Sequence, residues 1–322
     1  MAQLTLKQSI DMSQIASWDG DVVIANTSQI RISDGYRTQD YFGTFNYNSA
    51  GYLSGGTLTA TDAYQNGLYF SITGMNVNAA YAANLIDAGD VPSALKAALS
   101  SDDQVYGSEG NDVIIDYAGN DQLYGNAGND IFHISSGTNH IDGGSGFDLV
   151  KYTSNSQGVT VGSLGSSRFT ITEGDGQTDT FSNIERVTFL DNVTLATDVG
   201  AGQNAGSVYR IYQAAFDRAP DAAGLKYWIN DADNGASIQQ IAQGFVDSNE
   251  YRVLNPGLDS NSMINNLYKN VLSREADPDG FAYWQEQLAS GMSENEMLVS
   301  FSESNENIAN TAPTLDHGLW LL

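Results

Sequence analysis

Cysteine is absent from the 322-residue chain, and this excludes every kind of site that depends on a thiolate. Disulfides, zinc–cysteine clusters, iron–sulfur centres and cysteine nucleophiles are ruled out. Basic residues are scarce, because 13 Lys and Arg stand against 39 Asp and Glu and leave a formal net charge of −26 at pH 7. A chain this acidic repels phosphate backbones and anionic headgroups, so no nucleic-acid partner is expected. The same carboxylates favour a hard divalent cation, and Ca²⁺ is the first to consider.

Long apolar runs are also missing. No stretch approaches the roughly 20 apolar residues that span a bilayer, so a transmembrane protein is not expected. The first 18 residues, MAQLTLKQSIDMSQIASW, lack a basic segment followed by an apolar one, which argues against a secretory signal peptide. Either the protein stays in the cytoplasm or it leaves by a route without such a signal.

Five consecutive nine-residue units fill residues 107–151: GSEGNDVII, DYAGNDQLY, GNAGNDIFH, ISSGTNHID and GGSGFDLVK. Glycine is always fourth, Asp or Asn is sixth, and an apolar residue is eighth. These residues are, in the same order of units, Gly110, Gly119, Gly128, Gly137 and Gly146; Asp112, Asp121, Asp130, Asn139 and Asp148; Ile114, Leu123, Phe132, Ile141 and Val150. The pattern matches the GGxGxDxUx repeat of calcium-binding parallel β-helices.

Each unit is predicted to form a tight turn and a short strand, so that two units make one coil and the eighth-position side chains form the core. Glycine at position four permits a backbone conformation that turns carbonyl oxygens toward the gap between stacked turns. The sixth-position carboxylate adds another oxygen to this gap. Because Ca²⁺ accepts about six to eight oxygens, it is expected to bridge each turn to the turn one coil further on.

The turns fall on two edges of the predicted roll, and the edges differ in sequence. The first edge has glycine at position one of its three units (Gly107, Gly125, Gly143). Two calcium sites are expected there, one between Asp112 and Asp130 and one between Asp130 and Asp148. The second edge has Asp116 and Ile134 at position one, and a degenerate upstream unit adds Asp103 to Asp121 and Asn139. One or two weaker sites are expected on it, and their occupancy stays open.

The five units resemble the repeats-in-toxin (RTX) family of calcium-binding β-rolls. The resemblance implies bound Ca²⁺, export through a type I secretion apparatus, and folding outside a Gram-negative bacterium, in the extracellular space or at the cell surface. The missing signal peptide and the missing cysteines agree with it. Stacked carboxylates also repel each other until a cation screens them, so metal binding is expected to supply folding energy.

The segments that flank the repeats read as β structure. Residues 152–200 contain alternating runs around Val159, Phe169 and Val187 with Gly/Asp turns, and β-hairpins that cap the roll are expected. Residues 1–78 alternate apolar and polar residues between Gly/Asn/Ser turns, and residues 79–90 and 92–100 look helical.

A second duplication occupies the C-terminal third, with matching residues 56 positions apart. The pairs are Tyr212/Tyr268, Arg218/Arg274, Asp221/Asp277, Gly224/Gly280, Trp228/Trp284, Phe245/Phe301 and Glu250/Glu306. Apolar residues follow a helical period, and capping boxes start helices at Ser237 and Ser293, so each copy is predicted to contain about three helices. The block resembles the phycobilisome-linker-like helical domain of unknown function that often follows RTX repeats, and no pigment is inferred.

Other residues have a simpler interpretation than a functional one. Glu275 to Glu286 has EF-hand-like spacing, but Pro278 interrupts it, so a capped turn is favoured over a calcium site. Trp228 and Trp284 lie at helical spacing and are expected in the core, although they could stack on a sugar. His133, His140 and His317 are expected on the roll surface and in the tail, without a catalytic or metal role.

No catalytic motif is present, and the carboxylates Asp34, Asp40 and Asp62 have nothing to pair them, so no enzyme is expected. The apolar end, TAPTLDHGLWLL, resembles the end of a type I secretion signal, with a docked or frayed terminus as the alternative.

The expected fold is multidomain α+β: a β-rich domain (1–100), a parallel β-roll with its β flank (101–200) and an all-α tandem repeat (201–322). The expected function is a secreted calcium-binding structural protein that self-associates into a polymer or lattice, as a surface layer, filament or biofilm component. The alternatives are a calcium-dependent adhesin that binds cell-surface glycans and a small N-terminal hydrolase. Interfaces, symmetry and partners stay open.

Overall fold

The computed structural model describes residues 1–164, 168–255 and 259–322, and the chain forms two compact units. The first unit comprises residues 1–162 and 166–192, and the second residues 163–165 and 193–322. Within the described ranges, no helix has the length and apolar character needed to cross a membrane.

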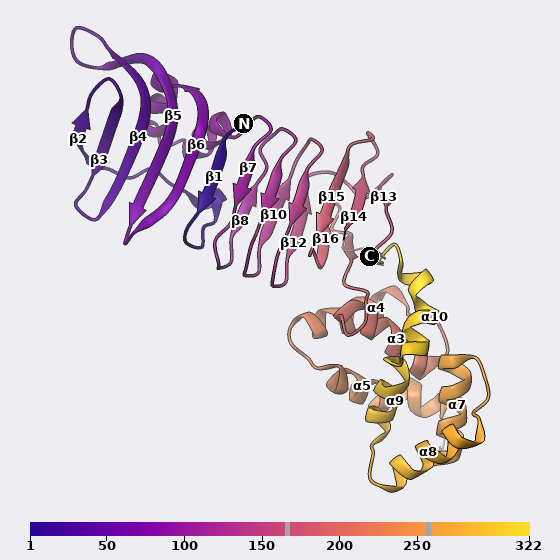
Figure 1. The fold of residues 1–322 in the computed structure, drawn as a ribbon. Helices are drawn as coiled ribbons and strands as arrows, with labels where there is room; N and C mark the ends of the chain where they lie inside the picture. Colours follow the sequence, from indigo (N-terminus) through magenta and orange to yellow (C-terminus); the bar gives the residue numbers. More distant parts are fainter. Residues whose placement is uncertain (165–167, 256–258) are drawn as a thin grey trace. The chain divides into compact units, whose positions relative to one another are not determined.

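A 12-stranded sheet runs through the first unit in the order β13-β14-β15-β11-β9-β7-β1-β6-β5-β4-β3-β2 (Figure 1). Its strands are β1 (Gln3–Leu6), β2 (Asp21–Ala25), β3 (Gln29–Ser33), β4 (Arg37–Tyr47), β5 (Leu53–Gln65), β6 (Leu68–Asn78), β7 (Gln104–Tyr106), β9 (Gln122–Tyr124), β11 (His140–Asp142), β13 (Thr160–Val161), β14 (Phe169–Thr172) and β15 (Thr178–Ser182). A second sheet of this unit pairs β8 (Val113–Ile115), β10 (Ile131–Ile134), β12 (Leu149–Tyr152) and β16 (Arg186–Thr188) in parallel.

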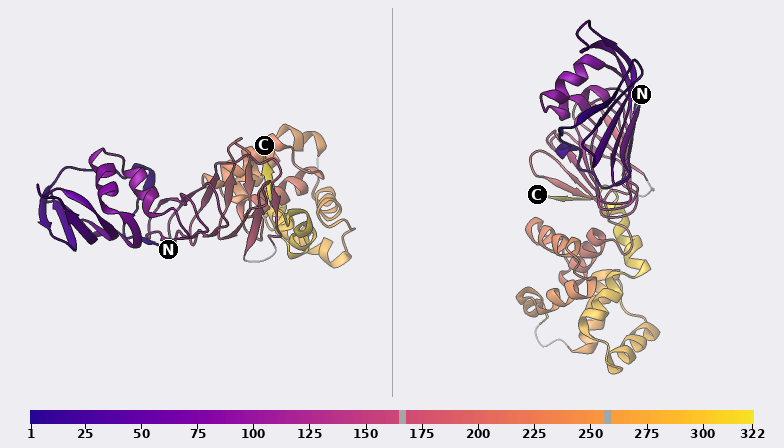
Figure 2. Two further views of the ribbon diagram at one scale, coloured as in Figure 1. Left: turned by 90° about the horizontal axis from the view of Figure 1, so that it is seen from above. Right: turned by 90° about the vertical axis from the view of Figure 1, so that its left-hand side faces the viewer.

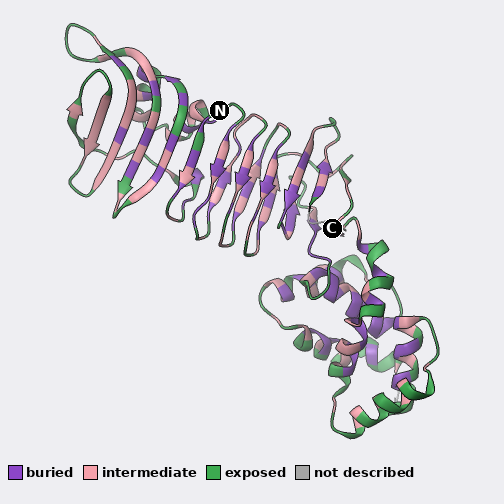
Figure 3. Ribbon diagram, viewed as in Figure 1, coloured by how far each residue is buried: buried purple, intermediate pink, exposed green. Residues whose placement is uncertain are grey.

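The nonapeptide units form the predicted roll. Strands of one sheet pair in parallel with the strand 18 residues further on, as in Val113 with Ile131 and Gln104 with Gln122. The eighth-position side chains fill the space between the two sheets, and all five are 0% exposed (Figure 3): Ile114, Leu123, Phe132, Ile141 and Val150. The two-unit coil and its core are therefore confirmed.

The start of the chain is built into the roll. Strand β1 pairs in parallel with β7 on one side and antiparallel with β6 on the other. After β1, Asp11 forms a parallel bridge with Val113 in the second sheet. Leu4, Leu6 and Ile10 are fully buried. Residues 3–11 thus act as one more coil, and the sheet continues from the roll into the N-terminal strands.

The N-terminal strands β2–β6 form an antiparallel meander that is covered on one face by two helices (Figure 2). These are α1 (Ala79–Asp87) and α2 (Val91–Ala98), which confirms the two predicted helices. Asn78 and Asp90 cap them by accepting hydrogen bonds from the backbone N–H groups of Tyr81 and Ser93. A short 3₁₀ turn, η1 (Met12–Gln14), follows the first coil.

The segment after the repeats only partly matches the expected hairpins. Strand β14 pairs antiparallel with β13 on one side and with β15 on the other. However, β15 and β16 also pair in parallel with β11 and β12 and so extend the roll. Phe181 and Val187, which are 0% exposed, continue the row of core residues.

The second unit is a helical duplication whose first and last strands form a short antiparallel pair. Its elements are β17 (Thr194–Ala196), α3 (Asn204–Phe216), α4 (Ala222–Asp233), α5 (Ile238–Asp247), α6 (Asn249–Leu254), α7 (Ser260–Leu272), α8 (Pro278–Ala289), α9 (Glu294–Ser302), α10 (Asn305–Leu315) and β18 (Leu319–Leu321). Within the described residues each copy has four helices, one more than the approximately three that were predicted. Ser248 and Ser304 have extended backbones and cap a new helix, which splits the predicted third helix in two.

Trp228 and Trp284, which were expected in the core, pack against the core of the helical copies but are themselves only partly buried. Trp228 packs against Phe245 and Trp284 against Phe301, both with ring centroids 4.8 Å apart. The capping boxes at Ser237 and Ser293 are formed. The apolar end of the chain is docked, because β18 pairs with β17 and buries Leu319 and Leu321.

Candidate metal centre

The sixth-position side chains form a ladder along each edge of the roll. On the first edge, Asp130 Oδ1 accepts a hydrogen bond from the backbone N–H of Asp112, and Asp148 Oδ1 accepts one from Asp130, each at 2.8 Å. On the second edge, Asp121 Oδ1 accepts from Asp103 at 2.8 Å and Asn139 Oδ1 from Asp121 at 2.9 Å. The structure therefore brings the predicted ligand residues together in two rows, each residue one coil from the next.

Residues outside the repeats complete both ladders. At the start, Asp112 accepts from the N–H of Ile10 at 2.6 Å, and Asp103 accepts from that of Ala2. At the end, Glu185 accepts from Asp148, and Asp179 Oδ1 accepts from Asn139, both at 2.7 Å. Asp179 and Glu185 were missed by the sequence analysis, because an inserted hairpin places them 40 and 37 residues after their partners instead of 18.

Three of the ladder carboxylates have a second oxygen that is buried and without a hydrogen-bond partner within the described ranges. These atoms are Asp121 Oδ2, Asp130 Oδ2 and Asp148 Oδ2. Burial raises the pKa of Asp121 to about 7 and the pKa values of Asp130 and Asp148 to about 6. A buried carboxylate without a partner is costly, so these groups call for a proton or a cation.

Glycine at position one keeps space open beside two of these oxygens. A Cβ atom on Gly125 would lie 2.2 Å from Asp130 Oδ2, and one on Gly143 would lie 2.4 Å from Asp148 Oδ2. Glycine at position four lets neighbouring turns approach, because a Cβ on Gly146 would lie 1.8 Å from the carbonyl oxygen of Gly128. The gap is therefore surrounded by carboxylate and carbonyl oxygens, which are the donors a hard cation such as Ca²⁺ takes.

The second edge satisfies more of its own polar groups. Asp116, which replaces glycine at position one, accepts hydrogen bonds from the N–H of Ser135 at 2.7 Å and from its hydroxyl at 2.9 Å. Asn139 is neutral, and its Nδ2 donates to the carbonyl oxygen of Ser136 at 3.2 Å. This edge offers fewer unpaired oxygens to a cation.

A second ladder runs through position five and was also missed. Asn111 Oδ1 accepts from the N–H of Asn129, and Asn120 Oδ1 from that of Thr138, each at 2.8 Å. Asn129 Oδ1 accepts from Phe147 at 3.0 Å. The signal was the tripeptide Gly-Asn-Asp in three consecutive units. These amides fix the turns without adding charge.

Cation binding at the roll must use backbone oxygens as well as carboxylates. The described part of the chain contains no cluster of three or more Asp, Glu or His side chains that could hold a metal by themselves. This agrees with one carboxylate per turn and with glycine at position four.

The remaining candidate residues lie apart from the ladders. Asp277 caps α8 by accepting from the N–H of Gly280 at 2.9 Å, and Glu286 lies within α8, so the predicted capped turn is formed. His133 and His140 lie in β10 and β11, and His317 follows α10.

The three N-terminal carboxylates have partners close by. Asp34 pairs with Arg37, Asp40 forms a bidentate pair with Arg31, and Asp62 accepts from Ser71. Asp40 and Asp62 are opposite each other on β4 and β5.

Comparisons with known families agree with both repeats. The family described as "RTX calcium-binding nonapeptide repeat (4 copies)" matches residues 98–132 and 133–151. A domain of unknown function, DUF4214, matches residues 188–255 and 251–311. The first family assigns Ca²⁺ as the bound cation, in agreement with the predicted cofactor. A comparison with curated proteins gives no match.

Two solved structures share short stretches with the chain. An extracellular lipase from Serratia marcescens is 26% identical over 28% of this chain and 14% of its own, with a TM-score of 0.25. A subunit of the mannuronan C5-epimerase from Azotobacter vinelandii is 28% identical over 24% of this chain and 37% of its own, with a TM-score of 0.18. The chain thus spans less than half of either protein.

Proposed function

We propose that this chain, which carries RTX calcium-binding repeats followed by two DUF4214 domains, is a secreted structural protein that folds on binding Ca²⁺ and then self-associates at the cell surface or in the extracellular matrix. The observation that carries the proposal is the row of buried, unpaired carboxylate oxygens on the roll. These carboxylates destabilise the folded roll when no cation is present, and a bound cation would turn their repulsion into a link between neighbouring coils.

The residues that would hold the cations belong to the turns. On the first edge they are Asp112, Asp130 and Asp148 with the carbonyl oxygens of the position-one and position-four glycines. On the second edge they are Asp103, Asp121 and Asn139 with Gly119 and Gly137. Bound Ca²⁺ would neutralise the stacked carboxylates and tie each turn to the next coil. Calcium binding would therefore stabilise the whole first unit.

Export before folding fits this chemistry. A roll that needs millimolar Ca²⁺ stays unfolded where calcium is scarce and folds where it is abundant, which suits a type I secretion apparatus and a Gram-negative cell surface. The absence of cysteine fits as well, because the cations take the stabilising role that disulfides have in many exported proteins.

The open end of the 12-stranded sheet supports self-association. Its outermost strand, β2, exposes Val22 by 62% and Val23 by 60%. Exposed apolar residues on an edge strand invite pairing with another chain. The net charge of −26 opposes contact between copies, and bound cations reduce that repulsion.

Sedimentation of the purified chain with and without Ca²⁺ tests the proposal. We expect large assemblies with millimolar Ca²⁺, a monomer in chelator, and loss of assembly in the variant V22K/V23K. The control is Tyr52→Lys, because Tyr52 is 72% exposed at the tip of the β4–β5 hairpin and lies outside strand β2. A folded wild-type chain that stays monomeric in Ca²⁺ at all concentrations would contradict self-association.

A calcium-dependent adhesin is the second candidate, favoured by two exposed aromatic side chains. Tyr227 is 61% and Tyr283 is 52% exposed, at equivalent positions of the two helical copies. Aromatic faces of this kind stack on sugar rings. A glycan array probed with wild type and with Y227A/Y283A distinguishes the candidates, since specific hits by a monomer that the variant loses would favour the adhesin. In neither case is catalysis proposed.

A further inference from the structure

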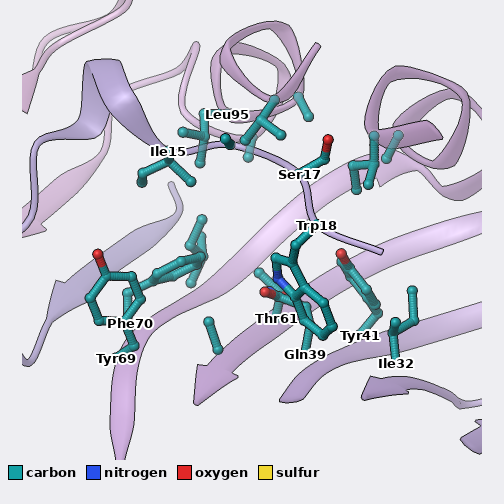
Figure 4. Close-up of a pocket in the computed structure, with 18 of the residues that line it drawn as sticks. Ile15, Ser17, Trp18, Ile32, Gln39, Tyr41, Thr61, Tyr69, Phe70 and Leu95 are labelled. Atoms are coloured by element: carbon teal, nitrogen blue, oxygen red, sulfur yellow. The ribbon is translucent and has the colours of Figure 1, made fainter. Parts of the chain in front are cut away.

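The N-terminal part of the first unit contains a cavity of about 400 Å³. It lies between the sheet β3–β6 and a cover formed by α1, α2 and the segment Asp11–Trp18 (Figure 4). A neighbouring cavity of about 80 Å³ shares Tyr41 and Ala82 with it. The combined space is in the range of pockets that enclose a small organic molecule.

Most of the wall is apolar. From the sheet come Ile32, Leu58, Phe70, Ile72, Met75 and Val77, and from the cover come Ile15, Trp18, Ala82, Ile86 and Leu95. Aromatic rings stand at both ends of the view in Figure 4, with Trp18 beside Tyr41 and Phe70 beside Tyr69. A wall of this composition favours apolar surface over water.

A small number of polar groups interrupt the apolar wall. The Tyr41 side chain projects from β4 beside Trp18 (Figure 4). Burial raises the pKa of Tyr41 to about 12, so the phenol stays neutral and available as a donor. The Gln39 amide is held in place by donating to Thr61 Oγ1 at 2.6 Å, and Thr61 in turn donates to the carbonyl oxygen of Asp40.

Two charged residues of the larger cavity already have partners. Arg37 forms an ion pair with Asp34 at 2.9 Å and lies 4.6 Å from the centre of the Trp18 ring. Asp11 accepts hydrogen bonds from the N–H and the hydroxyl of Ser13. Asp87 lines the smaller cavity, and its charge adds to burial in raising the pKa of Tyr41. An anion would be repelled by Asp87, and burying any charged ligand against this apolar wall would be costly.

The Trp18 ring is held in position at the edge of the cavity by its neighbours. Arg37 stacks on one part of its ring, and a Cβ on Gly20 would lie 2.6 Å from it, so the ring packs directly against the chain that follows. Ser17 and Ala16, which precede Trp18, are exposed. This part of the cover therefore borders solvent, whereas Leu95 and Ala82 of the helices are buried.

We propose that this cavity is a binding site for a small, neutral, mainly apolar molecule with one hydroxyl or carbonyl group, which hydrogen-bonds to Tyr41 while Trp18 covers its apolar face. The site is separate from the calcium ladders and does not depend on self-association.

Binding of the neutral fluorophore N-phenyl-1-naphthylamine to the full chain in millimolar Ca²⁺ tests the proposal. We expect saturable binding, with energy transfer from Trp18, because the other three tryptophans (Trp228, Trp284, Trp320) lie in the second unit. Trp18→Phe should remove the transfer within the first unit, and the directly excited signal at saturating probe shows that the site is still occupied, with a weaker affinity because Trp18 covers the ligand. The absence of saturable binding, or transfer that is unchanged in Trp18→Phe, would overturn the proposal.

Filling the cavity provides the matched comparison. Ala82→Leu adds bulk to the wall and should weaken probe binding at least tenfold, whereas Ala80→Leu on the same helix lies outside the wall and should not. Circular dichroism shows whether each variant is folded, and Ala63→Leu fills the same space from β5 if Ala82→Leu fails to fold. A folded Ala82→Leu that binds as tightly as wild type would show that the probe binds elsewhere.

The predicted hydrogen bond has its own test. Competition against the probe should show that 1-naphthol binds several-fold more tightly than naphthalene, and Tyr41→Phe should remove this difference while naphthalene binding stays the same. If wild type binds the two compounds with equal affinity, the cavity does not select for a hydroxyl group, and the proposed class of ligand is wrong.

Discussion

The two edges of the roll share one backbone design and differ in what they leave unpaired. Both have a carboxylate or amide at position six that accepts a hydrogen bond from the turn one coil before. On the first edge, Asp130 and Asp148 each keep a buried oxygen without a partner, next to a glycine. On the second edge, Asp116 accepts a hydrogen bond from Ser135, and Asn139 donates one to Ser136. Within the described residues, Asp121 is the one member of this edge that keeps a buried oxygen without a partner.

The difference indicates that the ladder of hydrogen bonds does not need a charge at every step. Hydrogen bonds along position six link the coils on both edges, including the step at the neutral Asn139. Glycine at position one keeps the space beside Asp130 and Asp148 open, whereas Asp116 fills the corresponding position of the second edge. The same backbone design is therefore expected to hold fewer ions on the second edge.

Removing calcium from both edges should have the largest effect. In excess chelator at neutral pH, we expect amide protons of residues 104–152 to exchange rapidly, because the buried carboxylates then repel each other without compensation. The helices of the second unit should stay protected, since their core is apolar: Val208, Ile211, Ile264, Met297 and Leu298 are all buried. Hydrogen exchange followed by mass spectrometry measures both regions in one sample. Equal protection of the roll with and without Ca²⁺ would count against the cation's role.

Adding a methyl group to a position-four glycine should destabilise the protein strongly inside the stack of coils and only slightly near its first coil. Gly146→Ala places a Cβ against the Gly128 carbonyl oxygen at a positive φ of 145°, and we expect a loss of more than about 4 kcal/mol in the free energy of unfolding. Gly110→Ala is the control at the same position of the first unit, where the nearest atom would lie 3.4 Å away, and it should cost less than about 1 kcal/mol. Urea unfolding in Ca²⁺ compares the two, and similar losses would refute the close approach of the turns.

Exchanging Asp and Asn at position six should reduce the difference in calcium affinity between the two edges. Asp130→Asn keeps the oxygen that accepts from Asp112 and removes the charge, so we expect calcium affinity to fall about tenfold or more, which is about 1.4 kcal/mol per factor of ten. Asn139→Asp should have the opposite, smaller effect by adding a carboxylate to the second edge. Isothermal titration of both variants measures the change. If Asp130→Asn binds as many ions as tightly as wild type, the first edge is not the stronger one.

Acid should act on the same carboxylates, and the sign of its effect depends on calcium. The folded pKa values of Asp121, Asp130 and Asp148, about 7, 6 and 6, lie above the ordinary value of about 3.9, so the folded state binds protons more tightly than the unfolded state. Metal-free stability is then full below about pH 4 and declines as the pH rises to about 7.

Circular dichroism and hydrogen exchange in chelator at pH 5 and pH 7.5 measure this pH dependence. We expect more folded roll at pH 5 than at pH 7.5, and Asp121→Asn should reduce the difference. In Ca²⁺ the order should reverse, because protons then compete with the cation. A metal-free roll that is more stable at pH 7.5 would contradict the assignment.

Local periodicity made the roll and the helical copies predictable. Glycine, Asp and an apolar residue recur every nine positions, so the coil length, the core residues and both rows of sixth-position side chains follow from the sequence. The 56-residue repeat and the capping boxes likewise indicate the helices, although the caps at Ser248 and Ser304, which divide the last helix of each copy, were overlooked.

Long-range pairing was not predictable from such patterns. Nothing in QLTL indicates that β1 lies between β6 and β7, because that position depends on segments about 65 and 100 residues away along the chain. Asp179 and Glu185 were hidden because the inserted hairpin breaks the nine-residue count. The cavity under α1 and α2 depends on how well the layers fit together, and residue types alone do not specify that fit.

The position of β1 has a consequence for the order in which the molecule is completed. As the ribosome extends the chain, β1 emerges before its neighbours β6 and β7, and its flanking amides at Ala2 and Ile10 need Asp103 and Asp112. This segment therefore waits for later ones, and through them for the cation. Withholding the cation would keep the entire first unit unfolded, which is the form that the proposed export requires.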